Sequence, residues 1–195
     1  MKTYRITILD DADGVELVSF VDRPAIERNL ISFNAYQKRE KVSFNEEMGI
    51  VTTPVLIPDL PIYRNQDGDE YYLMALPEDV RAIYTKFMKD NNGNKLNLMH
   101  QKGTELTVKD AFLLEVFLSD EKRGISAPRD FADLPNNTWF ASYKIEGEQL
   151  KKDIKDGKIN GVSIDGFLGI VDFQKDDTEL QTILTELTEL KKLIK

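Results

Sequence analysis

Apolar and polar residues alternate in short runs along most of the chain, which is the pattern of half-buried β-strands. The runs are rich in branched and aromatic residues, and Asp, Gly, Asn or Pro bounds them. This pattern predicts strands over Thr3–Leu9, Val15–Val21, Gly49–Ile57, Tyr71–Leu76, Lys95–Met99, Ala111–Leu118, Trp139–Ile145 and Gly161–Phe173. We therefore expect a β-rich body.

Two segments have helical rather than alternating periodicity. Pro77–Met88 begins with a proline and two acids, which suit the first turn of a helix, and its apolar residues recur at helical spacing. A second helix is expected over about Gly147–Asp156, and Gly157 follows it as a residue that readily adopts the left-handed cap conformation. Strands and helices together predict an α+β fold.

The carboxyl-terminal stretch differs from the body. Leu180, Leu187, Leu190 and Ile194 recur at three- and four-residue steps, with charged residues on the other faces. We predict a β-rich domain over residues 1–173, then a polar linker and an amphipathic, coiled-coil-like helix over 174–195. A helix of this length is marginal alone, so it either packs on the body or associates with another helix.

Composition narrows the possible functions. The chain has 195 residues, 41% of them hydrophobic, which is enough for one domain with a sizeable core. It has no cysteine and one histidine, which excludes a thiol nucleophile and a multi-histidine metal site within one subunit. The net charge of −8 disfavours binding to nucleic acid or anionic membranes, and no run approaches the roughly 20 apolar residues of a membrane span. We expect no cofactor and no metal.

The single histidine, His100, is the main candidate for chemistry. It ends the segment Asn97-Leu98-Met99-His100, and a serine hydrolase needs one such base, one oriented hydroxyl and usually one acid. A lone histidine at a strand end is also compatible with a structural role, in which the ring makes one hydrogen bond.

A hydroxyl and several carboxylates are available to complete such a site. Ser163 lies in Gly161-Val162-Ser163-Ile164-Asp165-Gly166, where nearby glycines allow a substrate to approach the backbone closely. The pattern is not the Gly-x-Ser-x-Gly elbow, because Asp165 stands where that motif has glycine. Glu115 interrupts the apolar run Ala111–Leu118, and a carboxylate there must face solvent, pair with a cation or serve a site.

Taken in order, these segments resemble the XkdF-type serine proteases of phages, relatives of the prohead (capsid maturation) proteases. The resemblance covers about Val51 to Gly169 and lies in the order of segments more than in any single motif. The segments that carry it are Val55–Asp59, Glu78–Met88, Asn97–His100, Leu114–Glu115, Thr138–Phe140 and Lys158–Gly166.

Two positions depart from the family pattern. Val116 replaces a serine after the glutamate, and Asp165 replaces the commoner glutamate with retention of charge. Leu17–Ala25 also resembles a segment that many prohead proteases carry after their catalytic serine, which draws attention to the adjacent Glu16.

The resemblance implies a compact, mostly antiparallel β-barrel flanked by helices, as in the herpesvirus assemblin and prohead protease fold. It also implies a serine endopeptidase that cleaves phage scaffold and major capsid proteins inside assembling proheads in the host cytoplasm, with a homodimer favoured. Ser163 would be the nucleophile and His100 the general base. Glu115 is the first choice for the acid that orients the ring, and Glu16 and Asp165 are its rivals.

Two other functions stay open. The chain could be a non-catalytic virion or assembly protein that keeps this fold and binds partners through its terminal helix. A calcium-binding module built on Asp67–Glu70 is a more distant alternative, because that spacing lacks the ligand pattern of a calcium loop.

Overall fold

The computed structural model describes residues 2–24, 42–66 and 68–173. The predicted linker and amphipathic helix of residues 174–195 lie outside this range, as does Asp67 of the calcium-loop alternative. Within the described ranges, no helix is long and apolar enough to span a bilayer.

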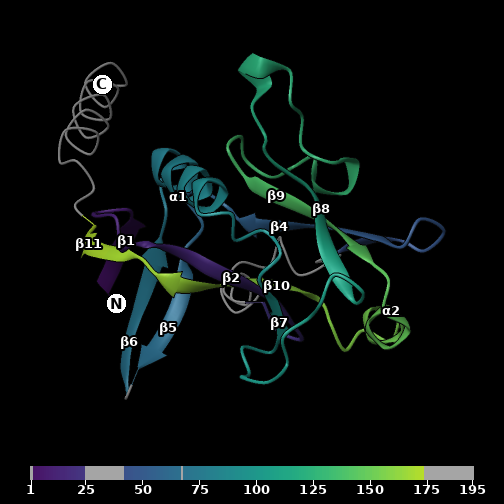
Figure 1. Ribbon diagram of the computed structural model, residues 1–195. Coiled ribbons are helices and arrows are strands. Elements are labelled where there is room, and N and C mark those ends of the chain that lie inside the picture. The colour runs from purple at the N-terminus through teal and green to yellow at the C-terminus, as the bar shows by residue number, and fades with distance from the viewer. Residues whose placement is uncertain (1, 25–41, 67, 174–195) are drawn as a thin grey trace, which may run out of the picture.

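The described chain contains short strands and two α-helices (Figure 1). The strands are β1 (Lys2–Thr7), β2 (Gly14–Val21), β3 (Ser43–Asn45), β4 (Ile50–Leu56), β5 (Ile62–Gln66), β6 (Asp69–Met74), β7 (Leu96–Leu98), β8 (Ala111–Leu118), β9 (Trp139–Ile145), β10 (Gly161–Phe167) and β11 (Gly169–Asp172). The helices are α1 (Pro77–Lys89) and α2 (Glu148–Lys155), and η2 (Glu121–Arg123) and η3 (Arg129–Phe131) are 3-10 turns. The predicted α+β class is confirmed.

The strands form three sheets, with the orders β11-β1-β6-β5, β10-β2-β7 and β3-β4-β9-β8. Most neighbours are antiparallel, and β1-β6 and β2-β7 are parallel. In none of the three sheets does the order of described strands return to its first strand. The expectation of a closed barrel is therefore not confirmed, because pairing is interrupted between the sheets.

One predicted strand is divided between two of these sheets. The sequence predicted a single strand over Gly161–Phe173, but β10 ends at Phe167 and β11 pairs with β1 instead. Gly169, the first residue of β11, lies close to the Leu9 side chain, since a Cβ there would lie 2.3 Å from Cγ of Leu9. The unpredicted strands β3 and β5 are short, and β5 ends in the polar residues Arg64, Asn65 and Gln66, so neither has a clear apolar alternation.

The core lies between the sheets and α1. Val80, Ile83 and Phe87 line the buried side of α1, and the Phe87 ring lies 5.0 Å from the ring of Trp139 on β9. The indole of Trp139 also meets Tyr84 edge-on, at 5.9 Å between ring centroids. Helical spacing thus directs one side of α1 into the core, where the helix packs against β2, β1 and β9, while α2 adds Leu150 and Ile154 to the same core.

An ion pair fixes the start of α1 to β1. Arg5 donates from Nε and Nη2 to both carboxylate oxygens of Asp79, at 2.7 and 2.8 Å, and the Leu76 amide donates to the same carboxylate at 2.9 Å. The Asp79 side chain is 1% exposed, whereas the Arg5 side chain is 32% exposed. Asp79 therefore caps the helix and neutralises a partly buried guanidinium.

We predict that Asp79→Ala lowers the free energy of unfolding by about 2 to 3 kcal/mol. The substitution leaves the Arg5 guanidinium without its buried carboxylate partner and removes the N-terminal cap of α1. Glu78→Ala is the matched control, since Glu78 also accepts from Arg5 but is 63% exposed. We expect the control to cost less than about 1 kcal/mol. Chemical denaturation of both variants measures the difference, and equal losses would contradict the role given to Asp79.

The Asp59 carboxyl makes the stability of the fold depend on pH. Burial and then the nearby charge of Glu78 raise the pKa of the Asp59 carboxyl, so ionisation disfavours the folded state. The stability linked to this group is present below the ordinary aspartate pKa and is lost as pH rises through the raised folded pKa. Asp59→Asn should therefore unfold at a higher temperature than the wild type near about pH 7 and at the same temperature near about pH 3. If Asp59→Asn still raised the unfolding temperature in acid, the stabilisation would not come from removal of the Asp59 charge.

Candidate active site

A row of polar side chains crosses the sheet β10-β2-β7. Ser163 of β10 is paired with Ser19 of β2, and Ser19 is in turn paired with Asn97 of β7. Directly opposed residues project from the same face of a sheet. Their neighbours Val18, Phe20 and Val162 belong to the hydrophobic core. Strand alternation therefore places the row on the sheet face opposite to these three apolar side chains.

A tight turn after β7 carries His100 to this row. The Gln101 amide donates to the Leu98 carbonyl at 3.0 Å, and both central residues, Met99 and His100, have positive φ angles of 55° and 56°. Such angles define a type I′ turn and are unfavourable for residues with a Cβ. The Thr104 hydroxyl oxygen lies 2.8 Å from the Leu98 carbonyl and 2.7 Å from the Gln101 carbonyl, which share its single hydrogen, and it accepts from the Leu98 amide. The surrounding hydrogen bonds thus hold a strained turn in place.

Among the described residues, two polar groups contact the imidazole of His100, both at Nδ1. The Ser19 hydroxyl oxygen lies 3.0 Å from Nδ1, and the Asp165 carboxylate lies 3.5 Å from the same nitrogen. The Ser19 hydroxyl donates its own hydrogen to the amide oxygen of Asn97. This arrangement favours a hydrogen on Nδ1, donated toward Ser19 and Asp165, and leaves Nε2 as the basic nitrogen.

The two serines of the row differ in exposure. Ser19 is completely buried, whereas Ser163 is half-buried and lines a cavity. Opposed residues in an antiparallel pair have Cβ atoms about 5 Å apart, so Ser163 lies one strand from the residue that contacts the imidazole. In the described part of the chain, Ser163 makes no hydrogen bond to His100. The structure therefore brings the predicted base and nucleophile to one sheet face without joining them directly.

Of the three candidate acids, Asp165 is the one at the ring. Glu115 is exposed on β8, in the sheet β3-β4-β9-β8, where a register shift between Leu113 and Glu115 interrupts the alternation. Glu16 is exposed on β2, where the pairing skips it between Val15 and Leu17. Neither shares the contact that Asp165 makes, so the preference for Glu115 gives way to its rival Asp165.

Comparison with protein-family models, curated proteins and solved structures found no match.

The resemblance to the XkdF-type proteases therefore stays a prediction. The evidence for the candidate site is the arrangement of its side chains. This geometry includes two residues to which the sequence analysis gave no role, Ser19 and Asn97. Both are polar residues inside apolar runs, Val18-Ser19-Phe20-Val21 and Leu96-Asn97-Leu98, and both are buried. Like Glu115, each of them is a polar residue that interrupts an apolar strand, so the same sequence signal marks all three positions.

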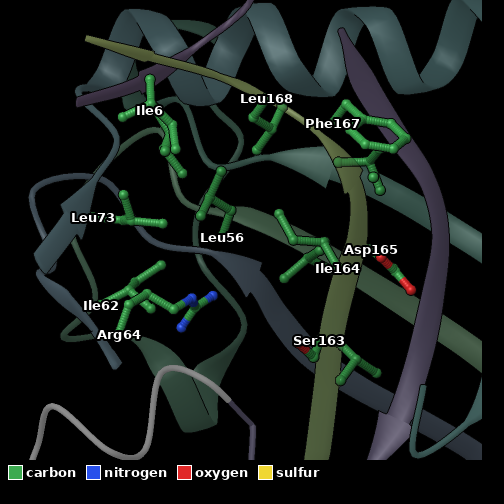
Figure 2. A pocket seen from close by; sticks show the side chains of 15 residues that line it. Ile6, Leu56, Ile62, Arg64, Leu73, Ser163, Ile164, Asp165, Phe167 and Leu168 are labelled. Atoms are coloured by element: carbon green, nitrogen blue, oxygen red, sulfur yellow. The ribbon is translucent and has the colours of Figure 1, made fainter. Parts of the chain in front are cut away.

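A cavity of about 340 Å³ lies beside Ser163 (Figure 2). Its walls come from all three sheets and are mostly aliphatic, with Arg64 and Asp165 as the charged residues of the lining. In Figure 2 Ser163 and Asp165 lie on the same strand, and the Arg64 side chain extends toward that strand from β5. A reactive hydroxyl at Ser163 would thus have a binding space next to it.

Gly166 maintains the position of Asp165. The backbones of β10 and β2 approach so closely there that a Cβ on Gly166 would lie 2.1 Å from the Gly14 carbonyl oxygen. The register also shifts between Asp165 and Gly166. Only glycine is compatible with this approach.

We predict that Gly166→Ala lowers the free energy of unfolding by about 2 kcal/mol or more, because the two strands must separate. Gly103→Ala is the control, since Gly103 also has a positive φ, 83°, but no atom lies within 4 Å of the position that its Cβ would occupy. Backbone conformation alone should cost the control about 1 kcal/mol. Urea denaturation compares the two, and equal costs would argue against the tight approach at Gly166.

Proposed function

We propose that this protein is a serine endopeptidase of the capsid-maturation type, with His100 as general base and Ser163 as nucleophile. The observation that carries the proposal is the imidazole itself, which Ser19 and Asp165 hold at Nδ1 on the strand face shared with Ser163. The His100 side chain is 37% exposed, so a substrate has access to it.

Each residue then has a defined part in the reaction. Nε2 of His100 removes the Ser163 proton as Oγ attacks the scissile carbonyl carbon, and the imidazolium returns that proton to the departing amine. Asp165 stabilises the imidazolium, and water hydrolyses the resulting acyl-enzyme by the same proton transfers. Ser19 positions the ring and is too buried to be the nucleophile. Attack requires Ser163 to move toward the ring, and catalytic contacts often tighten only when substrate binds.

The biological setting of the proposal comes from the family resemblance. The ordered segments around His100, Glu115 and Ser163 support phage scaffold and major capsid proteins as substrates, within assembling proheads in the host cytoplasm. They also support an assemblin-like arrangement of the strands and a homodimer. The described fold, mostly antiparallel strands with two helices, is compatible with such an arrangement.

One observation favours a second candidate, a non-catalytic assembly protein that keeps the same fold. The hydroxyl nearest to His100 belongs to the buried Ser19, as would be the case for a histidine that only stabilises the turn after β7.

Co-expression with scaffold and capsid proteins separates the two candidates. We expect Ser163→Ala to reduce their cleavage at least about 1,000-fold. We expect Ser19→Ala to reduce it only about tenfold, the worth of one hydrogen bond. Ser126→Ala, at an exposed serine outside the sheet β10-β2-β7, is the control and should cleave normally.

A fluorophosphonate probe, followed by mass spectrometry of the labelled peptide, tests the nucleophile without a substrate. The proposal requires the adduct on Ser163 and its loss in His100→Ala. Full cleavage by Ser163→Ala would remove this residue as nucleophile. Absence of both labelling and cleavage in the wild type would favour the non-catalytic candidate.

A further inference from the structure

The cavity beside Ser163 has the size and chemistry of a pocket for a side chain. Its lining includes large aliphatic side chains from five strands and from the residue between β10 and β11: Ile6, Leu56, Ile62, Leu73, Ile164 and Leu168. Its volume, about 340 Å³, is at the small end of the range for binding pockets, which suits one or two side chains. Figure 2 shows these side chains converging from several strands onto the space next to β10.

The strand that carries Ser163 is also the outer strand of its sheet. β10 is the outer strand of the order β10-β2-β7, and among the described strands it pairs with β2 alone. The outward backbone groups of an edge strand can pair with an added extended peptide. Alternate side chains of such a peptide point to the same side, so one of them can enter an adjacent pocket while the backbone stays paired.

Apolar surface continues beyond the cavity. Phe167 and Ile170 contribute to its lining and are nevertheless 71% and 53% exposed. Large apolar side chains left in solvent beside a cavity are typical of a surface that a ligand covers. Here the ligand would extend along the end of β10 toward β11.

We propose that a substrate peptide binds in extended form along the outer edge of β10 and places a large aliphatic side chain in this cavity. The inference rests on the proposed peptidase function, because Ser163 lines the cavity and the inserted side chain must therefore belong to a residue close to the scissile bond. Leucine, isoleucine and methionine are the side chains that match the walls, and the pocket is the specificity determinant of the enzyme.

The experiment is cleavage of a peptide library by the full chain, with mass spectrometry of the products. We expect a large aliphatic residue at one fixed position near the cut. Leu73 lies on β6, outside the catalytic sheet, so its variants reshape the pocket without touching the site. Leu73→Ala should shift the preference about 10- to 100-fold toward aromatic side chains, and Leu73→Phe should shift it by a similar factor toward small ones.

Two further variants test whether the effect is specific to residues that line the cavity. Ile170→Lys changes an exposed rim residue and should fold normally, yet it should lower kcat/KM for the aliphatic peptides about tenfold. Val108→Ala removes a similarly exposed apolar side chain that does not line the cavity, and it should leave the cleavage profile unchanged. Thermal unfolding of each variant identifies any that fail to fold.

The outcomes distinguish this inference from the function on which it depends. If the wild type labels with fluorophosphonate at Ser163 and cleaves peptides, but shows no aliphatic position or no response to the Leu73 and Ile170 variants, the pocket assignment is wrong and the peptidase stands. If the wild type neither labels nor cleaves any peptide, the peptidase function falls and the pocket assignment falls with it.

Discussion

The register of β10 against β2 is the constraint on which the site depends. Side chains alternate between the faces of a strand, so a slip of one residue would turn Ser163 into the core and Val162 out of it. The hydrophobic contacts of Val18, Phe20 and Val162 oppose such a slip. The close backbone approach at Gly166 fixes the far end of the same pairing. Apolar packing on one face thus determines where the polar groups lie on the other.

The turn that positions His100 has a strained backbone at Met99 and His100. Two consecutive residues with a Cβ in the left-handed region cost of the order of 1 kcal/mol each, and neither is Gly or Asn. The hydrogen bonds of Thr104, and the Met99 amide donating to the Phe20 carbonyl at 3.0 Å, offset this strain and tie the turn to β2. Strain of this kind, at a turn that presents an imidazole, is characteristic of functional sites.

Strand and helix positions were largely predictable because alternation and helical spacing are local properties. α1 begins at Pro77 as its proline and acids indicated, and β8 and β9 have the predicted bounds. The carboxylate that lies beside His100 was harder to predict, since its identity depends on which sheet each strand joins. Nothing near Glu115 in the sequence indicates that β8 belongs to a different sheet from β7, or that a register shift exposes its carboxylate. The contact between Asp165 and His100 joins residues 65 positions apart (165 minus 100), and only the pairing of β10 with β2 creates it.

The pairing of β1 with β11 has a consequence for chain order. Tyr4 lies opposite Asp172 and Thr7 opposite Gly169, so the first and last described strands are neighbours in one sheet. Domains whose first and last strands are neighbours tolerate circular permutation, because a connection can join those two strands while a surface loop is opened elsewhere. The segment around Ser19 could then follow Ser163 in a permuted chain and still occupy the same strand of the same sheet. The pairing of Ser19 with Ser163 therefore depends on the strands β2 and β10 and not on the order in which the chain carries them.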